Sequence, residues 1–201
     1  MTQFYRVAHA VFKPLIWLFF PFQAHGLENI PEDRAVVLCG NHSHAIDPAL
    51  VCLTLPRRMG VRIMAKKELM DQPVVGSLLQ KLGAFPVDRG HSDLTAVKTA
   101  IQTIRDGANL LVFPEGTRVE HEGDVRAKGG VVMIAMRTGA PMVPVYVGGK
   151  KKLFHMTHIV FGEPYEPKTQ TRHGTSEEYQ RYADEIVRRA YELGRKWEKR
   201  S

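Results

Sequence analysis

Short apolar runs alternate with amphipathic segments along most of the chain, and this alternation limits the possible folds more than any other feature. Strands rich in branched residues are expected at 35–39, 61–65, 84–87, 109–113, 141–147 and 158–161. Helices are expected at 47–55, 73–82, 92–106, 129–137 and 176–197. The order is typical of an α/β protein with a mixed, mostly parallel central sheet flanked by helices. The prolines of the 141–147 strand favour a place at the sheet edge, or bulges at the prolines.

The amino-terminal segment differs from the rest. Residues 11–22 are dense in large apolar and aromatic side chains but are interrupted by Lys13, Pro14 and Pro21, and the run is too short to span a bilayer. It is expected either to pack on the sheet as a core helix or to lie in a membrane interface. We expect residues 1–25 to form a membrane-interface segment and residues 26–201 to form one α/β domain, since 201 residues with 44% hydrophobic content can bury one full core.

A net charge of +7 favours an anionic partner, which could be nucleic acid, an anionic membrane or a phosphorylated substrate. No basic run is interleaved with stacking aromatic residues, so nucleic acid is not expected. Basic residues that could face lipid headgroups are Arg57, Arg58, Lys150, Lys151 and Lys152. The two cysteines, Cys39 and Cys52, have apolar surroundings and no metal-ligand spacing, and the amino terminus lacks a secretory signal. Both observations favour a reduced, cytosolic setting.

A first polar patch follows the 35–39 strand and contains Asn41, His42, His44 and Asp47. Five helical residues would rotate His42 and Asp47 apart by roughly 140°, so the two side chains can meet only across a loop. Asp47-Pro48 has the form of a helix N-cap followed by proline, which places that loop before the helix. A carboxylate on one imidazole nitrogen would leave the other free to take a proton from a hydroxyl.

Two other interpretations of this patch stay open. Asp47 could simply cap its helix while His42 bonds to a carbonyl. Alternatively His42, His44 and Asp47 could bind a metal ion in a hydrolase, although such sites draw further ligands from other strand ends.

A second polar patch, Phe113-Pro114-Glu115-Gly116-Thr117-Arg118, follows the 109–113 strand. The guanidinium of Arg118 beside the backbone amides of Gly116 and Thr117 suits a phosphate group. Glu115 could hold a substrate hydroxyl or fix an arginine. A surface salt bridge between Glu115 and Arg118 is the simpler alternative.

Four blocks in one order resemble the glycerolipid acyltransferases, the family that includes the 1-acyl-sn-glycerol-3-phosphate acyltransferases. They are Asn41-His42-x4-Asp47, Gly83-Ala84-Phe85-Pro86-Val87-Asp88-Arg89, Phe113-Pro114-Glu115-Gly116-Thr117-Arg118 and Val143-Pro144-Val145. Ala65-Lys66-Lys67-Glu68-Leu69 and Gly26-Leu27-Glu28-Asn29-Ile30-Pro31 also look like the bacterial members. The resemblance therefore covers nearly the whole chain.

The resemblance implies that the 26–201 domain is an acyltransferase in which His42 is the general base and Asp47 orients it. The acceptor would be lysophosphatidic acid, acylated at its sn-2 hydroxyl to phosphatidic acid, and the donor would be acyl-CoA or acyl carrier protein. Arg89 and Arg118 would bind the acceptor phosphate, Glu115, Gly116 and Thr117 would shape its pocket, and Lys66 would add positive charge. No metal or cofactor is implied, and the enzyme would lie on the cytoplasmic face of the membrane as a peripheral or monotopic protein.

One position departs from the family pattern, because Val119 stands where a serine commonly follows Thr-Arg. Three alternatives remain: an acyltransferase for another lysophospholipid, the metal-dependent hydrolase, and a catalytically silent lipid-binding protein.

Overall fold

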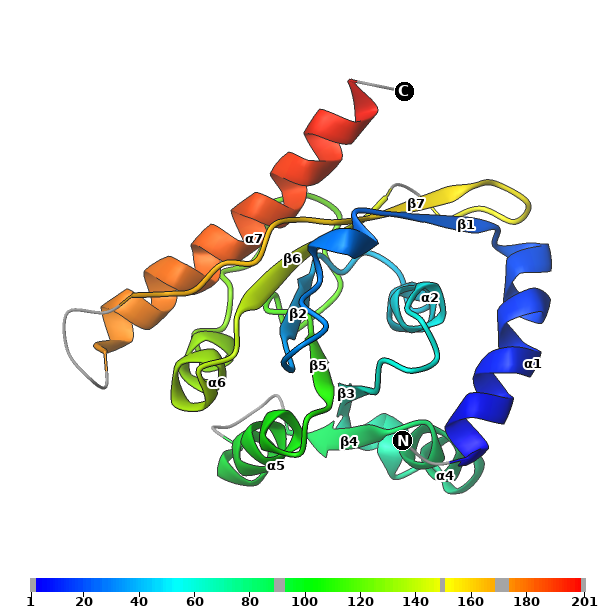
Figure 1. Ribbon diagram of the computed structural model, residues 1–201, viewed down its shortest axis with the longest axis horizontal. Coiled ribbons are helices and arrows are strands. Elements are labelled where there is room, and N and C mark those ends of the chain that lie inside the picture. The colour runs from blue at the N-terminus through cyan, green and yellow to red at the C-terminus, as the bar shows by residue number, and fades with distance from the viewer. Residues whose placement is uncertain (1–2, 89–92, 149–150, 169–173, 200–201) are drawn as a thin grey trace.

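A seven-stranded sheet forms the centre of the computed structural model, which describes residues 3–88, 93–148, 151–168 and 174–199 (Figure 1). The strand order is β1-β7-β6-β2-β5-β3-β4. The strands are β1 (Phe22–His25), β2 (Val37–Gly40), β3 (Val61–Lys66), β4 (Ala84–Val87), β5 (Asn109–Val112), β6 (Met142–Val147) and β7 (Thr157–Phe161). All neighbours pair in parallel except β6 and β7. The predicted mixed, mostly parallel α/β fold is therefore confirmed.

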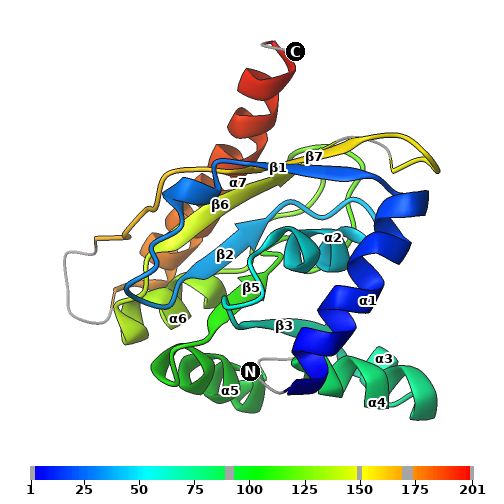
Figure 2. The same cartoon turned by 45° about the vertical axis from the view of Figure 1, so that its right-hand side comes forward.

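Helices cover both faces of this sheet. They are α1 (Gln3–Phe19), α2 (Asp47–Thr54), α3 (Lys67–Met70), α4 (Pro73–Lys81), α5 (Leu94–Arg105), α6 (Gly130–Thr138) and α7 (Ser176–Glu198), with a short 3-10 turn η1 (Leu27–Asn29). Figure 2 shows α1 beside α2 on one side of the sheet, while α5, α6 and α7 lie on the other. Two hydrophobic clusters correspond to these two faces.

The alternation of side chains along β2 explains why both faces are needed. Val37 and Cys39 belong to the cluster under α5, α6 and α7, whereas Leu38 belongs to the cluster under α2. None of the three is more than 1% exposed. A strand buried on both sides requires an apolar residue at every position, and the unbroken apolar run at 35–39 reflects this requirement.

The expectation that the 141–147 strand lies at an edge or bulges at its prolines is wrong. β6 pairs with β2 on one side and β7 on the other, and its register with β2 runs without interruption through Pro144. Pro144 lacks an N–H, but its carbonyl still accepts a hydrogen bond from the N–H of Gly162. The sheet therefore loses one donor here and keeps its alignment.

The amino-terminal segment contributes a helix and a strand. Along α1, Tyr5 and Ala8 are buried and Phe12 and Ile16 pack against the core, so one face of the helix belongs to the domain. The sheet then begins at Phe22 with β1, which pairs with β7. β1 is not among the strands expected from the sequence. In the ranges that the structure describes, no helix has the length and hydrophobicity needed to cross a bilayer.

Candidate active site

The two polar patches lie at one edge of the sheet. β2, β3, β4 and β5 are mutually parallel, so the residues after each strand leave the sheet at the same edge. That edge is where open α/β sheets place their ligands. The topology thereby brings residues 41–47 next to residues 113–118, about a third of the chain away.

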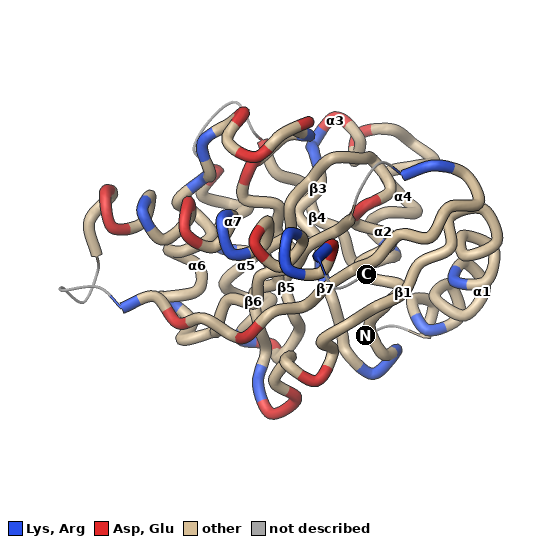
Figure 3. Tube along the Cα trace, turned by 90° about the horizontal axis from the view of Figure 1, so that it is seen from above, with Lys and Arg blue, Asp and Glu red and all other residues tan. Residues whose placement is uncertain are grey.

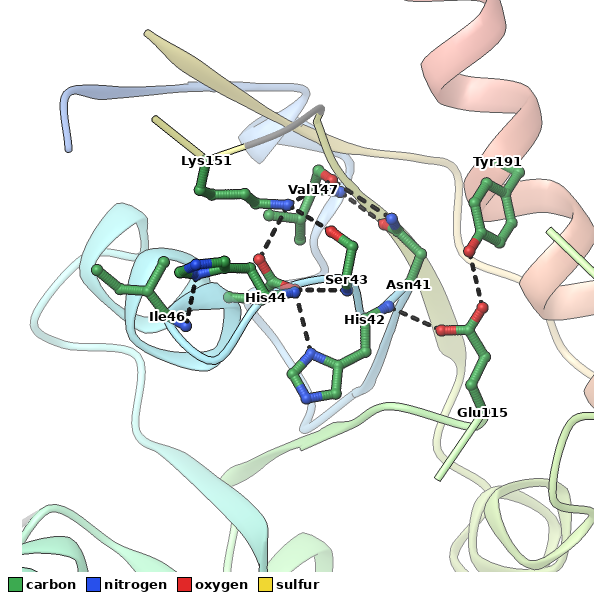
Figure 4. A network of polar contacts seen from close by, with 10 residues as sticks. Asn41, His42, Ser43, His44, Ile46, Glu115, Val147, Lys151 and Tyr191 are labelled. Carbon is green, nitrogen blue, oxygen red and sulfur yellow. Dashed lines mark hydrogen bonds and ion pairs between the residues drawn. The ribbon is translucent and has the colours of Figure 1, made fainter. Parts of the chain in front are cut away.

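His42 and Asp47 meet across a loop, as their spacing predicted. The imidazole Nδ1–H donates to Asp47 Oδ2 at 3.1 Å, because an ionised carboxylate can only accept (Figure 4). Asp47 is fully buried, and the imidazole is 10% exposed and stacks on the ring of Phe113, with centroids 4.4 Å apart. Within the described part of the chain, Nε2 has no hydrogen-bond partner. The ring is therefore fixed at one nitrogen and available at the other.

The expectation that Asp47 caps helix α2 is wrong. Asp47 is the first residue of the helix, Ile46 occupies the N-cap position, and no side chain caps this end. The carboxylate instead turns back to the preceding loop, where Oδ2 also accepts the N–H groups of Ser43 and His44 at 2.8 and 2.7 Å. The loop from 42 to 47 thus closes around this one oxygen.

A buried lysine completes the surroundings of Asp47. Lys151 Nζ lies 3.0 Å from Asp47 Oδ1, and its side chain is fully buried. Burial alone would raise the pKa of Asp47, but the hydrogen bond from His42 and the charge of Lys151 outweigh this effect and hold that pKa below its ordinary value. Burial lowers the pKa of Lys151, against the opposing effect of Asp47. The prediction that Lys151 faces lipid headgroups is therefore wrong.

The backbone of His42 is held from the second polar patch. The N–H of His42 donates to Glu115 Oε2 at 2.8 Å, and the carbonyl of His42 accepts the N–H of Val119 at 2.8 Å. Glu115 Oε1 accepts from the Tyr191 hydroxyl on α7 at 2.8 Å. Burial raises the pKa of Glu115, although both hydrogen bonds oppose it. The contact at position 119 uses the backbone, so a serine hydroxyl is not needed for it.

Asn41 links the His42 loop to the sheet. Its Oδ1 accepts the N–H of Val147 at 2.7 Å, and its Nδ2 donates to the carbonyl of the same residue at 3.3 Å. The side chain thus continues the pairing of β2 with β6 by one residue past the end of β2. This contact makes Asn41 a residue that orients the loop.

The expected phosphate-binding residues are placed only in part. Arg89 lies outside the described residues. Thr117 and Arg118 are exposed after the turn that Gly116 closes at a φ of 70°, which favours glycine. Arg118 forms no hydrogen bond or ion pair with any other residue whose position is described, so the alternative of a Glu115–Arg118 salt bridge is wrong. Lys66, at the end of β3, pairs with Glu68 at 3.2 Å, and both side chains are exposed.

The geometry does not supply the metal site of the hydrolase alternative. His44 is exposed, and its Nδ1 accepts the N–H of Ile46 at 3.3 Å. Across the ranges that the structure covers, no three histidine, cysteine or acidic residues are grouped so that they could share a metal ion.

Lys151 and Tyr191 were missed as site residues by sequence reasoning. Lys151 lies in a run with Lys150 and Lys152, and nothing local distinguishes it from its neighbours. Tyr191 reaches Glu115 from 76 residues away. Both contacts depend on how β6 and α7 pack, which local patterns do not encode.

The fold and this site define an α/β protein with a histidine–aspartate pair at the carboxyl edge of a mostly parallel sheet. The family model described as "Acyltransferase" matches residues 21–148, a range that includes both polar patches. The chain belongs to the acyltransferase family.

Named relatives agree with this placement. The chain is 34% identical over 166 residues to the 1-acyl-sn-glycerol-3-phosphate acyltransferase of Bacillus subtilis, covering 80% of this chain and 81% of that protein. It is also 34% identical over 139 residues to the protein of the same name from Borreliella burgdorferi, covering 68% of this chain and 54% of that relative. Among solved structures, the 1-acyl-sn-glycerophosphate (LPA) acyltransferase PlsC from Thermotoga maritima superposes with a TM-score of 0.68 at 28% identity, covering 94% of this chain and 77% of that one.

Proposed function

We propose that this protein transfers a fatty acyl group from an acyl thioester to the sn-2 hydroxyl of lysophosphatidic acid, giving phosphatidic acid. The observation that carries the proposal is the imidazole of His42, bound at Nδ1 to Asp47 and free of hydrogen bonds at Nε2 within the described structure. The relatives from Bacillus subtilis and Borreliella burgdorferi are 1-acyl-sn-glycerol-3-phosphate acyltransferases, and they suggest the substrate class.

In the proposed reaction, His42 Nε2 takes the proton of the acceptor hydroxyl as its oxygen attacks the thioester carbonyl. The new ester C–O bond forms, the C–S bond breaks, and the imidazolium returns the proton to the departing sulfur. Asp47 stabilises the imidazolium and keeps Nδ1 protonated. The donor, acyl-CoA or acyl carrier protein, is a co-substrate, and no further cofactor enters the reaction.

The acceptor phosphate would bind at the loops after β4 and β5. We assign it to Arg118, to the backbone amides of Gly116 and Thr117, and to Arg89, with Lys66 adding to the positive field. Arg118 supports this assignment, because it is an exposed guanidinium beside a glycine turn. Both carboxylate oxygens of Glu115 already accept hydrogen bonds, so we assign it to positioning His42. A bound phosphate would hold the hydroxyl near His42, where fixed proximity contributes much of the rate.

We place the protein on the cytoplasmic face of the cell membrane as a peripheral or monotopic protein. An exposed apolar stripe on α1, formed by Phe4, Val7, Val11, Leu15 and Leu18, supports this location. The sequence of α1 contains basic residues and no acidic ones, as Figure 3 shows. This positive charge suits contact with anionic headgroups.

The test is a panel of donors and acceptors with purified protein in liposomes, with products identified by mass. Acyl-CoA and acyl carrier protein donors are each combined with lysophosphatidic acid, other lysophospholipids and a phosphate-free monoacylglycerol. We expect phosphatidic acid as the main product and little transfer to monoacylglycerol. His42→Ala should lower kcat by at least about 10²-fold without unfolding the protein.

His44→Ala is the matched control, because its side chain is exposed and should be dispensable for transfer. Full turnover by folded His42→Ala would overturn the proposed chemistry. Activity lost in His44→Ala together with a stoichiometric metal ion would favour the hydrolase instead. Vesicle binding without turnover by the wild-type protein would indicate a silent lipid-binding protein.

A further inference from the structure

Lys151 occupies a position that its sequence context does not suggest. It lies between β6 and β7, next to the exposed Lys152, yet its side chain is fully buried. Its Nζ forms an ion pair with Asp47 Oδ1 at 3.0 Å and donates to Ser43 Oγ at 2.8 Å and to the Val147 carbonyl at 3.3 Å (Figure 4).

These contacts surround the ammonium group with protein oxygens. A lysine ammonium has three N–H donors and no acceptor, and three acceptors surround this one. Because its side chain is fully buried, the ammonium is not available to a phosphate or a lipid headgroup. Lys151 therefore acts on the protein itself and is not a substrate ligand.

The three acceptors lie around the proposed catalytic pair. Asp47 Oδ1 forms the ion pair with Lys151, whereas Oδ2 accepts hydrogen bonds from the His42 ring and from the N–H groups of Ser43 and His44. Each carboxylate oxygen thus has its own partners, which fixes the rotation of the carboxylate. Ser43 and Val147 tie the same ammonium to the His42 loop and to β6.

We infer that Lys151 is a positioning residue for acyl transfer: it holds Asp47 ionised and keeps Oδ2 directed at the His42 imidazole. The inference rests on the proposed function of the His42–Asp47 pair. The charge of Lys151 lowers the pKa of Asp47 against the opposing effect of burial. Replacing Lys151 by an uncharged residue should therefore make protonation of the His42–Asp47 pair easier.

The direction of the pH effect follows from the charges around the pair. Among the described residues, the titratable groups around the His42–Asp47 pair include Glu115 after β5, Lys151 after β6 and His44 in the loop, and Tyr191 on α7 bonds to Glu115. Lys151 is the cation in contact with Asp47. Without it, the pair takes up its proton at a higher pH, so the acidic limb of the kcat/KM profile should move to higher pH.

The experiment compares two uncharged variants, Lys151→Met and Lys151→Gln, with Lys152→Met as the matched control at the exposed neighbour. We expect kcat to fall roughly 10-fold or more, the acceptor KM to change less than about twofold, and the acidic limb to rise by about half a pH unit or more. Lys151→Arg retains the charge and should keep the limb near its wild-type position. Lys152→Met should leave the acidic limb at its wild-type position, because its side chain is exposed and makes no contact with Asp47 in the described structure.

The glutamine variant keeps a hydrogen-bond donor and provides the same test if the methionine variant does not fold. Folded, uncharged variants with an unchanged kcat and an unchanged limb would overturn the inference. A rise in acceptor KM larger than the fall in kcat would also overturn it, because it would make Lys151 a substrate ligand.

A readout without substrate separates this inference from the proposed function. In the wild-type protein and in each uncharged variant, the carbon-13 resonance of the Asp47 carboxyl is followed against pH. We expect it to titrate at higher pH in the variants, whether or not acyl transfer occurs. Absence of transfer by the wild type would contradict the proposed function alone, and an unmoved Asp47 titration would contradict the role of Lys151 alone.

Discussion

Asp47 is a buried charge with hydrogen-bond or ion-pair partners on four residues. They are the ring of His42, the backbone N–H groups of Ser43 and His44, and the ammonium of Lys151. A buried carboxylate without such partners would take up a proton, and it could not then stabilise an imidazolium. The partners therefore explain how a fully buried residue can serve the proposed proton transfer.

Glu115 is the second buried carboxylate of the site, and its pKa shift gives a prediction for stability. Burial raises its folded-state pKa above the ordinary value of 4.5. A group with a raised folded pKa contributes most to stability below its unfolded pKa, and the contribution is lost as pH rises through the folded pKa. Glu115→Gln removes this titration. The free energy of unfolding of the variant should therefore increase relative to that of the wild type as pH rises from about 4 to 7.

Urea unfolding at several pH values in this interval measures the difference. Glutamine can still accept the N–H of His42, so Glu115→Gln should retain most of its acyltransferase activity. Glu115→Ala leaves that buried N–H unpaired and should cost about 1–3 kcal/mol at pH 7. A pH-independent gap between Glu115→Gln and the wild type would contradict the assignment of Glu115 as a buried, titrating support.

At the scale of elements, α7 holds part of the site in place, although no local sequence pattern predicts this contact. The helix begins with a capping box, in which Thr175 and Glu178 exchange hydrogen bonds, and packs on β6. Tyr191 on this helix donates to Glu115, which in turn holds His42. A displacement of α7 should therefore reach the loop of His42 through two hydrogen bonds.

A substitution at Gly194 would test how closely α7 must approach the sheet. It lies one helical turn after Tyr191, and a Cβ placed there would come within 2.4 to 2.6 Å of the Tyr146 ring on β6. Gly194→Ala should lower the free energy of unfolding by about 1–3 kcal/mol in urea denaturation and lower kcat as well. Gly130→Ala in α6 is the control, since a Cβ there meets nothing within 4 Å. Equal stability of the two variants would contradict the close packing of α7.

At the scale of the whole molecule, exposed apolar side chains gather along α1 and the turn before β7. The turn contributes Leu153, Phe154 and Met156, and the Phe154 ring lies 6.1 Å from that of Phe19 at the end of α1. The Phe154 N–H also donates to the Phe19 carbonyl at 2.7 Å. Two distant segments therefore form one apolar surface, which suits insertion into a lipid interface.

Charged substitutions on α1 should weaken membrane binding without unfolding the domain. Val11 and Leu18 are each 58% exposed on the face away from the core. The double variant Val11→Asp/Leu18→Asp should lose at least about 10-fold in affinity for anionic liposomes in a sedimentation assay, because it removes apolar contact and adds repulsion. Leu94→Asp, at an exposed position on α5, should bind as the wild type does. Undiminished binding by the double variant would place the membrane contact elsewhere.

Local sequence patterns predicted the α/β class, most of the strands and helices, and the two polar loops, because hydrophobic periodicity and turn residues act over short distances. They also indicated that His42 and Asp47 could meet only across a loop. They did not predict β1, the interior place of β6, or the direction of the Asp47 side chain, since these depend on strand order and on partners brought in from other elements. Only the tertiary structure placed Lys151 and Tyr191 at the site, because a buried charge or hydroxyl is defined by acceptors that lie far away in the sequence.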